Sequence, residues 1–307
     1  MKKAQFEFAW IFAAIVGAVI LFFAFYFVGT RLLSQKQEEA TIEAQSLDIL
    51  LNPFSHFGEI AKASAALLAL QQAYELNVEC NNDGLGYNEI TLSRKGAKGI
   101  SRVVRDKYIF VENTTTKKFQ ALAMPFEMPW RVADIIILWP YEKKYCFVGA
   151  PSFIKETLGN TTTGLNISSI IFVDNQRGCP ENATTVCFTQ RGCDVNINIQ
   201  QNITTKAGRS IYFAGEALLY ASIFSDPEIY NCNVKRLASR LKIQTRIYRE
   251  KAIGLSRKGC SANFNLEQLG NSANSLSETL TQNNINDLWE AAQQLKRQNE
   301  IADCALF

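Results

Sequence analysis

Histidine is almost absent from this sequence of 307 residues, in which His56 is the single example. A Ser-His-Asp or Cys-His catalytic arrangement needs an imidazole, and the HExxH zinc motif needs two of them. The P-loop pattern, the GxGxxG fingerprint and the GxSxG elbow do not occur either. We therefore predict no cofactor, name no catalytic or metal-binding residue, and interpret His56, three residues after Pro53, as a turn histidine.

An excess of one charge is also missing, because 32 Lys and Arg face 29 Asp and Glu and leave a net charge of +3. A nucleic-acid binder needs a clustered basic face, so we predict no nucleic-acid partner. Two basic stretches, 94–107 and 235–251, could touch anionic lipid heads or surface glycans, although such runs are more often solvated faces. The 47% hydrophobic content excludes a disordered tail and allows a buried core.

One long apolar run is present near the N-terminus. From Phe8 to Gly29 the chain has 22 residues without a charge, enough to cross a hydrocarbon core of about 30 Å. A cleaved secretory signal has a shorter apolar stretch of roughly 7 to 15 residues and ends at small residues. Here the run ends in bulky Phe25, Tyr26 and Phe27, so we interpret it as a retained membrane anchor in contact with lipid.

The cysteines contain no CxxC pair, and all of them follow the apolar run: Cys80, Cys146, Cys179, Cys187, Cys193, Cys232, Cys260 and Cys304. With a single histidine they give poor support for zinc sites. An oxidised disulfide framework is the better interpretation, with buried free thiols as the alternative. The sequence leaves the pairing open and favours only Cys260 with Cys304, because both lie beyond a long basic helix.

Five Asn-x-Ser/Thr sequons are candidate glycosylation sites, at Asn113, Asn160, Asn166, Asn182 and Asn202. Their number alone is poor evidence, but all five fall in polar, turn-like stretches of the middle third, where an exported loop would accept a glycan. Lys2 and Lys3 favour an inside N-terminus slightly. Sequons, cysteines and charges together predict that the N-terminus is cytoplasmic and that the chain after about residue 31 is extracellular.

The chain divides by pattern into four segments, which we predict to be an inner tail with a transmembrane helix (1–30), a helical stalk (31–76), a mixed α/β ectodomain with disulfides (77–213) and a helical C-terminal region (214–307). In the stalk, one helix continues the anchor and ends at Asn52-Pro53. A second apolar stripe from Ile60 to Tyr74 predicts another helix, although the following ELNVEC could form a strand.

The fold class that these patterns predict is α+β, with a central mixed sheet. KYIFV, DIIILWP and YCFVG are typical of buried strands, and YCFVG, SFIKETL and SSIIFVD follow one another as a β-α-β unit. After Asp226-Pro227 three amphipathic stripes predict three helices, the last two separated by Asn283-Asn284.

Two further features could carry a ligand or partner. Asp174 ends an apolar run, where it could lie at the carboxyl edge of a sheet and contact a ligand, although a simple strand end is the plainer interpretation. Trp130 and Trp139 flank an apolar strand, and we interpret them as core anchors rather than as an exposed adhesion patch.

The N-terminal KKAQFEFAWIFAAIVGAVILFFAFYF resembles the class III signal of archaeal type IV pilin-like proteins over about the first 50 residues. The resemblance implies cutting between Ala4 and Gln5 by a prepilin-type peptidase, and a helix that anchors a precursor or joins a filament. Glu7 departs from the usual later glutamate. KYCFVGAP and IFSDPEIYNCNVKRL resemble segments of uncharacterised single-pass surface proteins of small-genome archaea, which implies location but no activity.

These features favour a non-enzymatic surface protein that serves attachment, envelope assembly or a pilus-like complex with other surface proteins or further copies of itself. The first alternative is an anchored solute-binding or accessory subunit of a membrane complex, with its ligand near Asp174. The second is an extracellular hydrolase that uses paired carboxylates, which need no histidine. No spacing in the sequence singles out such a pair.

Overall fold

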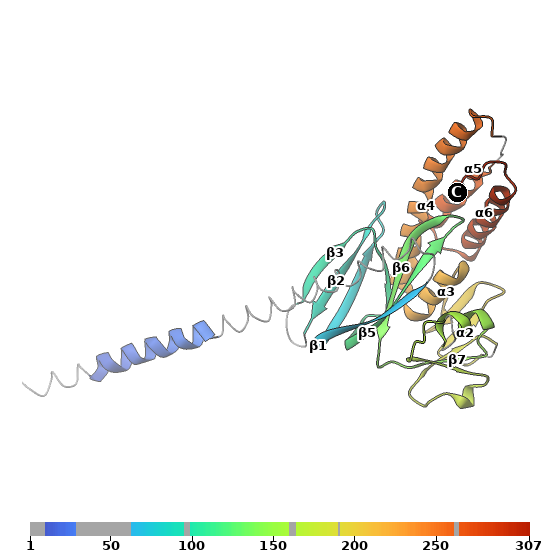
Figure 1. Cartoon of the computed structure of the whole chain (residues 1–307). Coiled ribbons are helices and arrows are strands. Elements are labelled where there is room, and N and C mark those ends of the chain that lie inside the picture. The colour runs from blue at the N-terminus through green and yellow to red at the C-terminus, as the bar shows by residue number, and fades with distance from the viewer. Residues whose placement is uncertain (1–9, 29–62, 95–98, 160–163, 190, 261–263) are drawn as a thin grey trace, which may run out of the picture.

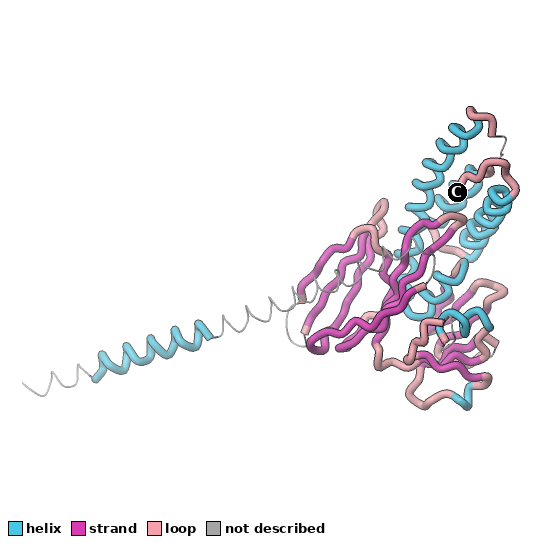
Figure 2. The backbone as a smooth tube through the Cα atoms, viewed as in Figure 1, coloured by secondary structure: helices cyan, strands magenta, loops and turns pink. Residues whose placement is uncertain are grey.

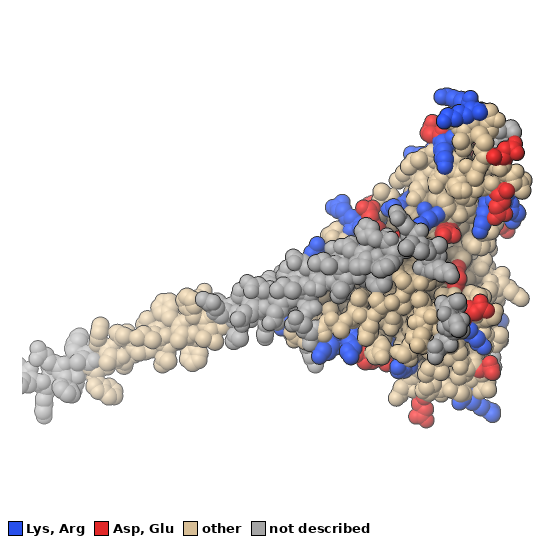
Figure 3. Space-filling model, in the orientation of Figure 1, with Lys and Arg blue, Asp and Glu red and all other residues tan. Residues whose placement is uncertain are grey.

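The computed structural model describes residues 10–28, 63–94, 99–159, 164–189, 191–260 and 264–307. An N-terminal helix, Trp10–Val28, stands apart from the rest of the molecule (Figure 1) and leaves its large apolar side chains exposed. Among the described residues it is the one helix that is long and apolar enough to span a membrane. Figure 3 shows no charged side chain on this helix, whereas both signs of charge are scattered over the visible surface of the sheets and C-terminal helices.

Two six-stranded mixed sheets and five α-helices form the described part of the chain after residue 62, where the sequence predicts one central sheet (Figure 2). The first sheet, sheet A, contains β1 (Ser64–Asn81), β2 (Tyr87–Ser93), β3 (Ile100–Val104), β4 (Tyr108–Val111), β5 (Thr114–Glu127) and β6 (Arg131–Pro140). The second, sheet B, contains β7 (Tyr145–Val148), β8 (Ile170–Val173), β9 (Thr184–Cys187), β10 (Val195–Asn198), β11 (Ile203–Lys206) and β12 (Arg209–Tyr212). The helices are α2 (Ser152–Leu158), α3 (Gly215–Phe224), α4 (Pro227–Ser256), α5 (Leu266–Glu278) and α6 (Gln282–Glu300), with a short 3₁₀ turn, η2, at Gln176–Gly178.

The predicted helix over 60–74 is wrong from residue 64 onward, because this segment is strand β1. The apolar residues of this segment fit two periods, because they recur at alternate positions as well as at helical spacing. The residues at alternate positions, Leu68, Leu70, Tyr74 and Leu76, are the buried ones. β1 pairs with β2 on one side and β5 on the other, so tertiary pairing decides between the two periods. The predicted stalk residues 31–62 lie outside the described residues.

Sheet A has the order β3-β2-β1-β5-β6-β4 and is antiparallel except for the β4–β6 pair. It curls so that β4 returns beside β2, where the Ile109 amide donates to Asn88 Oδ1 at 3.3 Å. The curl encloses one apolar core, which includes Leu76, Ile90 and Phe119. The opposite faces of β4, β5 and β6 belong to the main core, which sheet A shares with sheet B and the helices.

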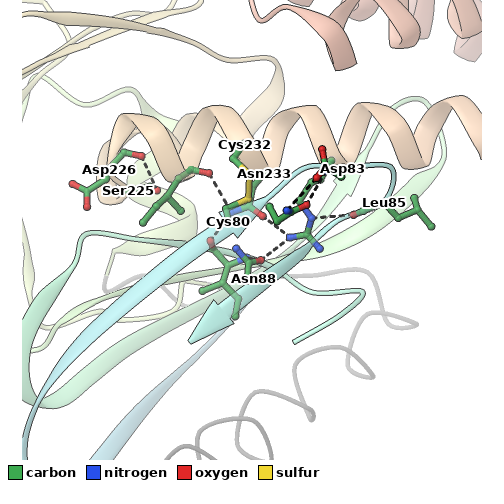
Figure 4. Close-up of a disulfide and its surroundings, with 12 residues drawn as sticks. Cys80, Asp83, Leu85, Asn88, Ser225, Asp226, Cys232 and Asn233 are labelled. Atoms are coloured by element: carbon green, nitrogen blue, oxygen red, sulfur yellow. Dashed lines mark hydrogen bonds between the residues drawn. A yellow bond between two sulfur atoms is a disulfide. The ribbon is translucent and has the colours of Figure 1, made fainter. Parts of the chain in front are cut away.

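Helix α4 is tied to the curled sheet by a buried cation, Arg236, whose exposed fraction is 0%. Its guanidinium donates to Asn88 Oδ1 at 2.7 Å, to Asn233 Oδ1 at 2.8 Å and to two backbone carbonyl oxygens, those of Leu85 and Lys107, at 3.0 Å (Figure 4). These partners all carry neutral oxygens, so hydrogen bonds from Nε and Nη1 hold the buried guanidinium, whereas its Nη2 has no hydrogen-bond partner among the described residues.

A disulfide reinforces the same junction. Cys80 at the end of β1 is bonded to Cys232 on α4, one turn from Arg236 (Figure 4). The guanidinium also lies 4.7 Å from the ring centre of Tyr108 on β4, within reach of a cation–π interaction. Strands β1 and β2 and the edge strand β4 of sheet A are thus fastened to one helix.

The three predicted C-terminal helices are confirmed as α4, α5 and α6, and α4 begins at Pro227 with Asp226 as its N-cap residue, as predicted. The predicted break at Asn283-Asn284 is wrong, because both residues lie in the first turn of α6. Thr281 is the N-cap instead, and its side chain accepts from the Asn284 amide at 3.2 Å.

Candidate functional site

The β-α-β unit predicted from sequence is present in sheet B. β7 leads through α2 to β8, and the two strands pair in parallel from Tyr145 with Ile170 to Val148 with Val173. β9 then lies on the other side of β7, also parallel to it, and β10 is parallel to β9. The sheet order is therefore β12-β11-β10-β9-β7-β8.

This order creates a topological switch point between β7 and β9. The connection after β7 runs to one side of that strand, and the connection after β8 returns to the other side. In open sheets with parallel strands, ligands bind in the crevice outside the carboxyl ends of the strands where the order reverses. The residues that follow β7 and β9 are therefore the first place to examine for a site.

The two faces of sheet B differ in what covers them. On one face, Phe147 and Val186 pack in the main core, to which α2 and α3 also contribute. On the other, outer face, Val148, Cys187 and Cys193 form a small separate cluster. Buried parallel strands are normally covered by helices on both faces, so a disulfide-rich loop cluster takes the place of a helix here.

Two disulfides brace this outer face. Cys146 on β7 is bonded to Cys179, which follows η2, and Cys187 at the end of β9 is bonded to Cys193. The second bond closes a short loop at the switch point. With Cys80–Cys232 and Cys260–Cys304, all eight cysteines are paired, and the last pair is the one that the sequence favours.

A groove of about 820 Å³ lies against the carboxyl ends of β7 and β9 and the outer face of β10 to β12, and we call it the edge groove. One row of register partners crosses this outer face from strand to strand: Val148, Cys187, Asn196, Thr205 and Ser210. The last three of these residues line the groove, together with Phe188, Thr189 and Arg191 from the disulfide-closed loop.

Local hydrogen bonds hold the groove in shape. Asn196 Nδ2 donates to the Cys193 carbonyl at 2.8 Å, and its Oδ1 accepts from the Cys193 amide at 3.2 Å. Asn198 Nδ2 donates to Gln201 Oε1 at 2.8 Å, and its Oδ1 accepts from the Gln201 amide at 3.1 Å. The loop wall and the turn at the far end are therefore both fastened to β10.

Arg191 is the only charged residue among those that line the groove, so the groove carries a positive charge. The nearby Asp194 is engaged elsewhere: its Oδ2 accepts from both the amide and the hydroxyl of Thr185 at 2.8 Å. The Thr185 amide is the main reason that the pKa of Asp194 is lowered. The edge groove thus presents amides, hydroxyls, one guanidinium and the ring of Phe188.

An ion cluster joins β11 of sheet B to the residue that follows β4 of sheet A. Glu112, which follows β4, accepts hydrogen bonds from Lys206 on β11 and from Lys143 before β7. Lys206 Nζ also donates to the carbonyl oxygens of Ile223 and Ser225 at the end of α3, at 3.0 and 3.2 Å. Burial lowers the pKa of Lys206, whereas for Glu112 the two ammonium groups outweigh burial and lower the pKa.

Asp174 does end a strand at the carboxyl edge of the sheet, but it does not line the groove. It follows β8, the outermost strand, and 96% of its side chain is exposed. Its carboxylate lies 4.0 Å from Lys155 on α2, an exposed ion pair. The edge that the sequence indicates is thus correct, whereas Asp174 follows β8, the neighbour of β7, and not either of the two strands that flank the switch point.

The sequons have different surroundings. Asn166 and Asn182 are exposed, and Asn113 is exposed while its Oδ1 accepts from the Val78 amide at 2.9 Å. Asn202 is half-buried, and its Nδ2, the atom that a glycan would occupy, donates to Asn286 Oδ1 at 3.4 Å. Asn160, His56, Ala4 and Gln5 lie outside the described residues.

Both tryptophans that sequence interpretation assigns to the core are buried. Trp139 stacks on Phe224 with ring centres 4.2 Å apart, and its Nε1 donates to Ser169 Oγ at 3.0 Å. Trp130 packs on Tyr248 with ring centres 4.0 Å apart.

The second basic stretch, 235–251, forms much of α4. Most of its Lys and Arg side chains are exposed or half-buried, and Arg236 is the buried exception.

No protein-family model, curated protein or solved structure matches the chain. What is established is a mixed α+β fold with an N-terminal apolar helix and four disulfides. The edge groove escapes sequence reasoning because its residues come from three strands, β10 to β12, and from the segments that follow β7, β9 and β10. The close spacing of Cys187 and Cys193 before the amide-rich 196–202 is the signal that could have indicated it.

Proposed function

We propose that this chain is a membrane-anchored, non-enzymatic recognition protein whose ectodomain binds a polyhydroxylated ligand, such as a surface saccharide, in the edge groove. The observation that carries the proposal is the position of this groove at the switch point of sheet B, braced by Cys146–Cys179 and Cys187–Cys193. Attachment to a neighbouring surface would then be the role of the ectodomain.

The chemistry of the lining supports this class of ligand. Side-chain amides and hydroxyls both donate and accept, which matches the hydroxyl groups of a sugar. Phe188 adds an apolar surface for the carbon face of a sugar ring, and Arg191 favours neutral or acidic saccharides over basic ones. The volume of about 820 Å³ suits a short oligosaccharide, since ligand sites usually measure roughly 300 to 1,000 Å³.

The proposed topology places the N-terminus in the cytoplasm and the ectodomain outside. Four disulfides support an oxidising surrounding for residues 80–304. Protease treatment of intact cells should therefore remove the mass that follows the N-terminal helix. Protection of that mass until the membrane is opened would contradict this topology.

The proposed maturation is cutting between Ala4 and Gln5, as in pilin-like precursors, with a permanently uncut anchor as the alternative. The apolar helix Trp10–Val28 supports either outcome. Intact-mass analysis of the protein from mature membranes distinguishes them, because a polypeptide that begins at Met1 excludes the processing.

The binding proposal is tested with the full-length protein in nanodiscs on an array of neutral, acidic and basic saccharides. We expect binding of neutral or acidic members, and a loss of about tenfold in affinity for Arg191→Ala, which removes a charged hydrogen-bond donor. Arg177→Ala is the matched control, since Arg177 in η2 is also exposed but lies outside the groove. An array without binding, or equal losses in both variants, would refute the proposal.

A further inference from the structure

A second recess, which we call the central cleft, has a volume of about 550 Å³. It lies among the end of β5, α2, the start of α3 and α6, and it shares no lining residue with the edge groove. Its lining combines polar groups with apolar side chains, among them Met124, Phe126 and Leu165. A recess of this size, in which polar groups converge beside apolar side chains, has the general form of a small-molecule site.

The charge of the central cleft is opposite to that of the protein. Glu127, Glu156 and Glu216 line it together with a single ammonium group, that of Lys296. Three negative charges against one positive charge leave −2 at the lining, in a chain whose net charge is +3. The recess therefore attracts cations and repels anions.

Glu216 is fixed in place by two neighbours. Its Oε1 accepts from Thr157 Oγ1 on α2 at 2.8 Å and from the Tyr220 hydroxyl at 2.6 Å. Burial first, and then this bond to Glu216, raise the pKa of Tyr220, so the phenol stays a donor. The two donors thus fix the orientation of the Glu216 side chain at the wall of the cleft.

An aromatic ring completes the wall. Trp289 on α6 is half-buried and lies against Gly215. If residue 215 had a Cβ, that atom would lie only 3.3 Å from Cζ3 of the indole. Gly215 has a φ of +73°, so glycine both permits the backbone turn that starts α3 and lets the indole approach the chain. Indole faces attract organic cations.

We infer that the central cleft binds an organic cation, a guanidinium or alkylammonium group carried on an apolar body. The three carboxylates supply the counter-charge, Trp289 supplies the π-face, and the apolar lining receives the body. Among the described residues, no group of three or more His, Cys, Asp or Glu is placed to hold a metal ion, so the spacing of the acids suits a larger cation.

The test is a calorimetric titration of the full-length protein in nanodiscs with n-butylguanidinium, and with neutral n-butylurea as its shape-matched control. We expect saturable binding of the guanidinium only. Glu127→Gln should weaken it about threefold or more, and Lys296→Gln should tighten it by a similar factor, because each removes one exposed charge from the lining. Glu181→Gln, exposed and remote from the cleft, should leave affinity unchanged.

The opposite signs expected for these two variants separate recognition of charge from a loss of folding, which would weaken binding in both. A capped arginine peptide identifies the source of the cation: tighter binding than n-butylguanidinium assigns it to a protein partner, and weaker binding to a free small molecule. Equal binding of n-butylurea, no binding of either cationic probe, or the same response in Glu127→Gln and Lys296→Gln would overturn the inference.

Discussion

Arg236 Nη1 on α4 donates to Asn88 Oδ1 on β2 at 2.7 Å, and this bond joins two elements that are 148 residues apart in sequence. The same Asn88 oxygen accepts from the Ile109 amide of β4, so one side chain connects β2, the edge strand β4 and the helix. The contact between α4 and sheet A therefore depends on the curl that brings β4 beside β2.

Replacing Arg236 by methionine should destabilise the protein by about 3 kcal/mol, because each oxygen that it contacts would lose a donor at a buried junction. Urea unfolding followed by circular dichroism measures the change. Arg246→Met, on the exposed side of the same helix, should stay within about 0.5 kcal/mol of the parent. Similar losses in both variants would contradict the role given to Arg236.

The disulfides should differ in what they stabilise. Cys80–Cys232 spans 152 residues and Cys187–Cys193 spans 6, so loop-closure entropy predicts contributions of about 5 and about 2.4 kcal/mol respectively. Paired Cys→Ser variants and thermal unfolding test this order. Removing Cys187–Cys193 should instead reduce saccharide binding strongly, since that bond closes the wall of the edge groove. A larger stability loss for the short loop would contradict the expectation.

Glycans should occupy Asn166 and Asn182 rather than Asn202. The first two side chains are exposed, whereas Asn202 Nδ2 is directed to Asn286 on α6. Peptide mass spectrometry of the protein from its native membrane, before and after glycosidase treatment, measures occupancy at each position. A glycan on Asn202 would show that α6 does not pack as described.

Acid should weaken the junction of the two sheets. Lys206 and Lys143 hold the pKa of Glu112 below its ordinary value of 4.5, so its stabilising effect is complete above that pH and is lost as the pH falls through the folded-state pKa. The urea midpoint should therefore drop between pH 7 and pH 3 more steeply in the parent than in Glu112→Gln. At pH 7 that variant should already be less stable by about 2 kcal/mol, because it leaves two ammonium groups unpaired.

If the urea midpoint of Glu112→Gln fell between pH 7 and pH 3 as steeply as that of the parent, the ion cluster would not be the cause of the acid sensitivity. Glu228→Gln is the control, because Glu228 forms a mostly exposed pair with Arg209 and should contribute little at either pH.

Local patterns were sufficient to predict much of the fold. The apolar run, the β-α-β unit and the C-terminal stripes each carry their own period, and the structure confirms them. β1 could not be predicted in the same way, since its apolar residues fit two periods and only pairing with β2 and β5 selects one. The division of the strands into two sheets could not be predicted either. It depends on pairings between residues far apart in sequence, such as those of β1 with β5.

The candidate sites depend even more on tertiary placement. Asp174 was predicted at the correct edge of the sheet from the end of an apolar run, but strand order decides which edge residues meet, and that order is not written in local sequence. The carboxylates of the central cleft come from β5, α2 and α3, and no spacing along the chain relates them.

The most direct test of the edge groove as a recognition site is hydrogen–deuterium exchange of the full-length protein with a saccharide that it binds on the array. The account predicts slower exchange in peptides that cover 187–206, with the central cleft unaffected. Protection confined to the central cleft, or protection nowhere in sheet B, would contradict it.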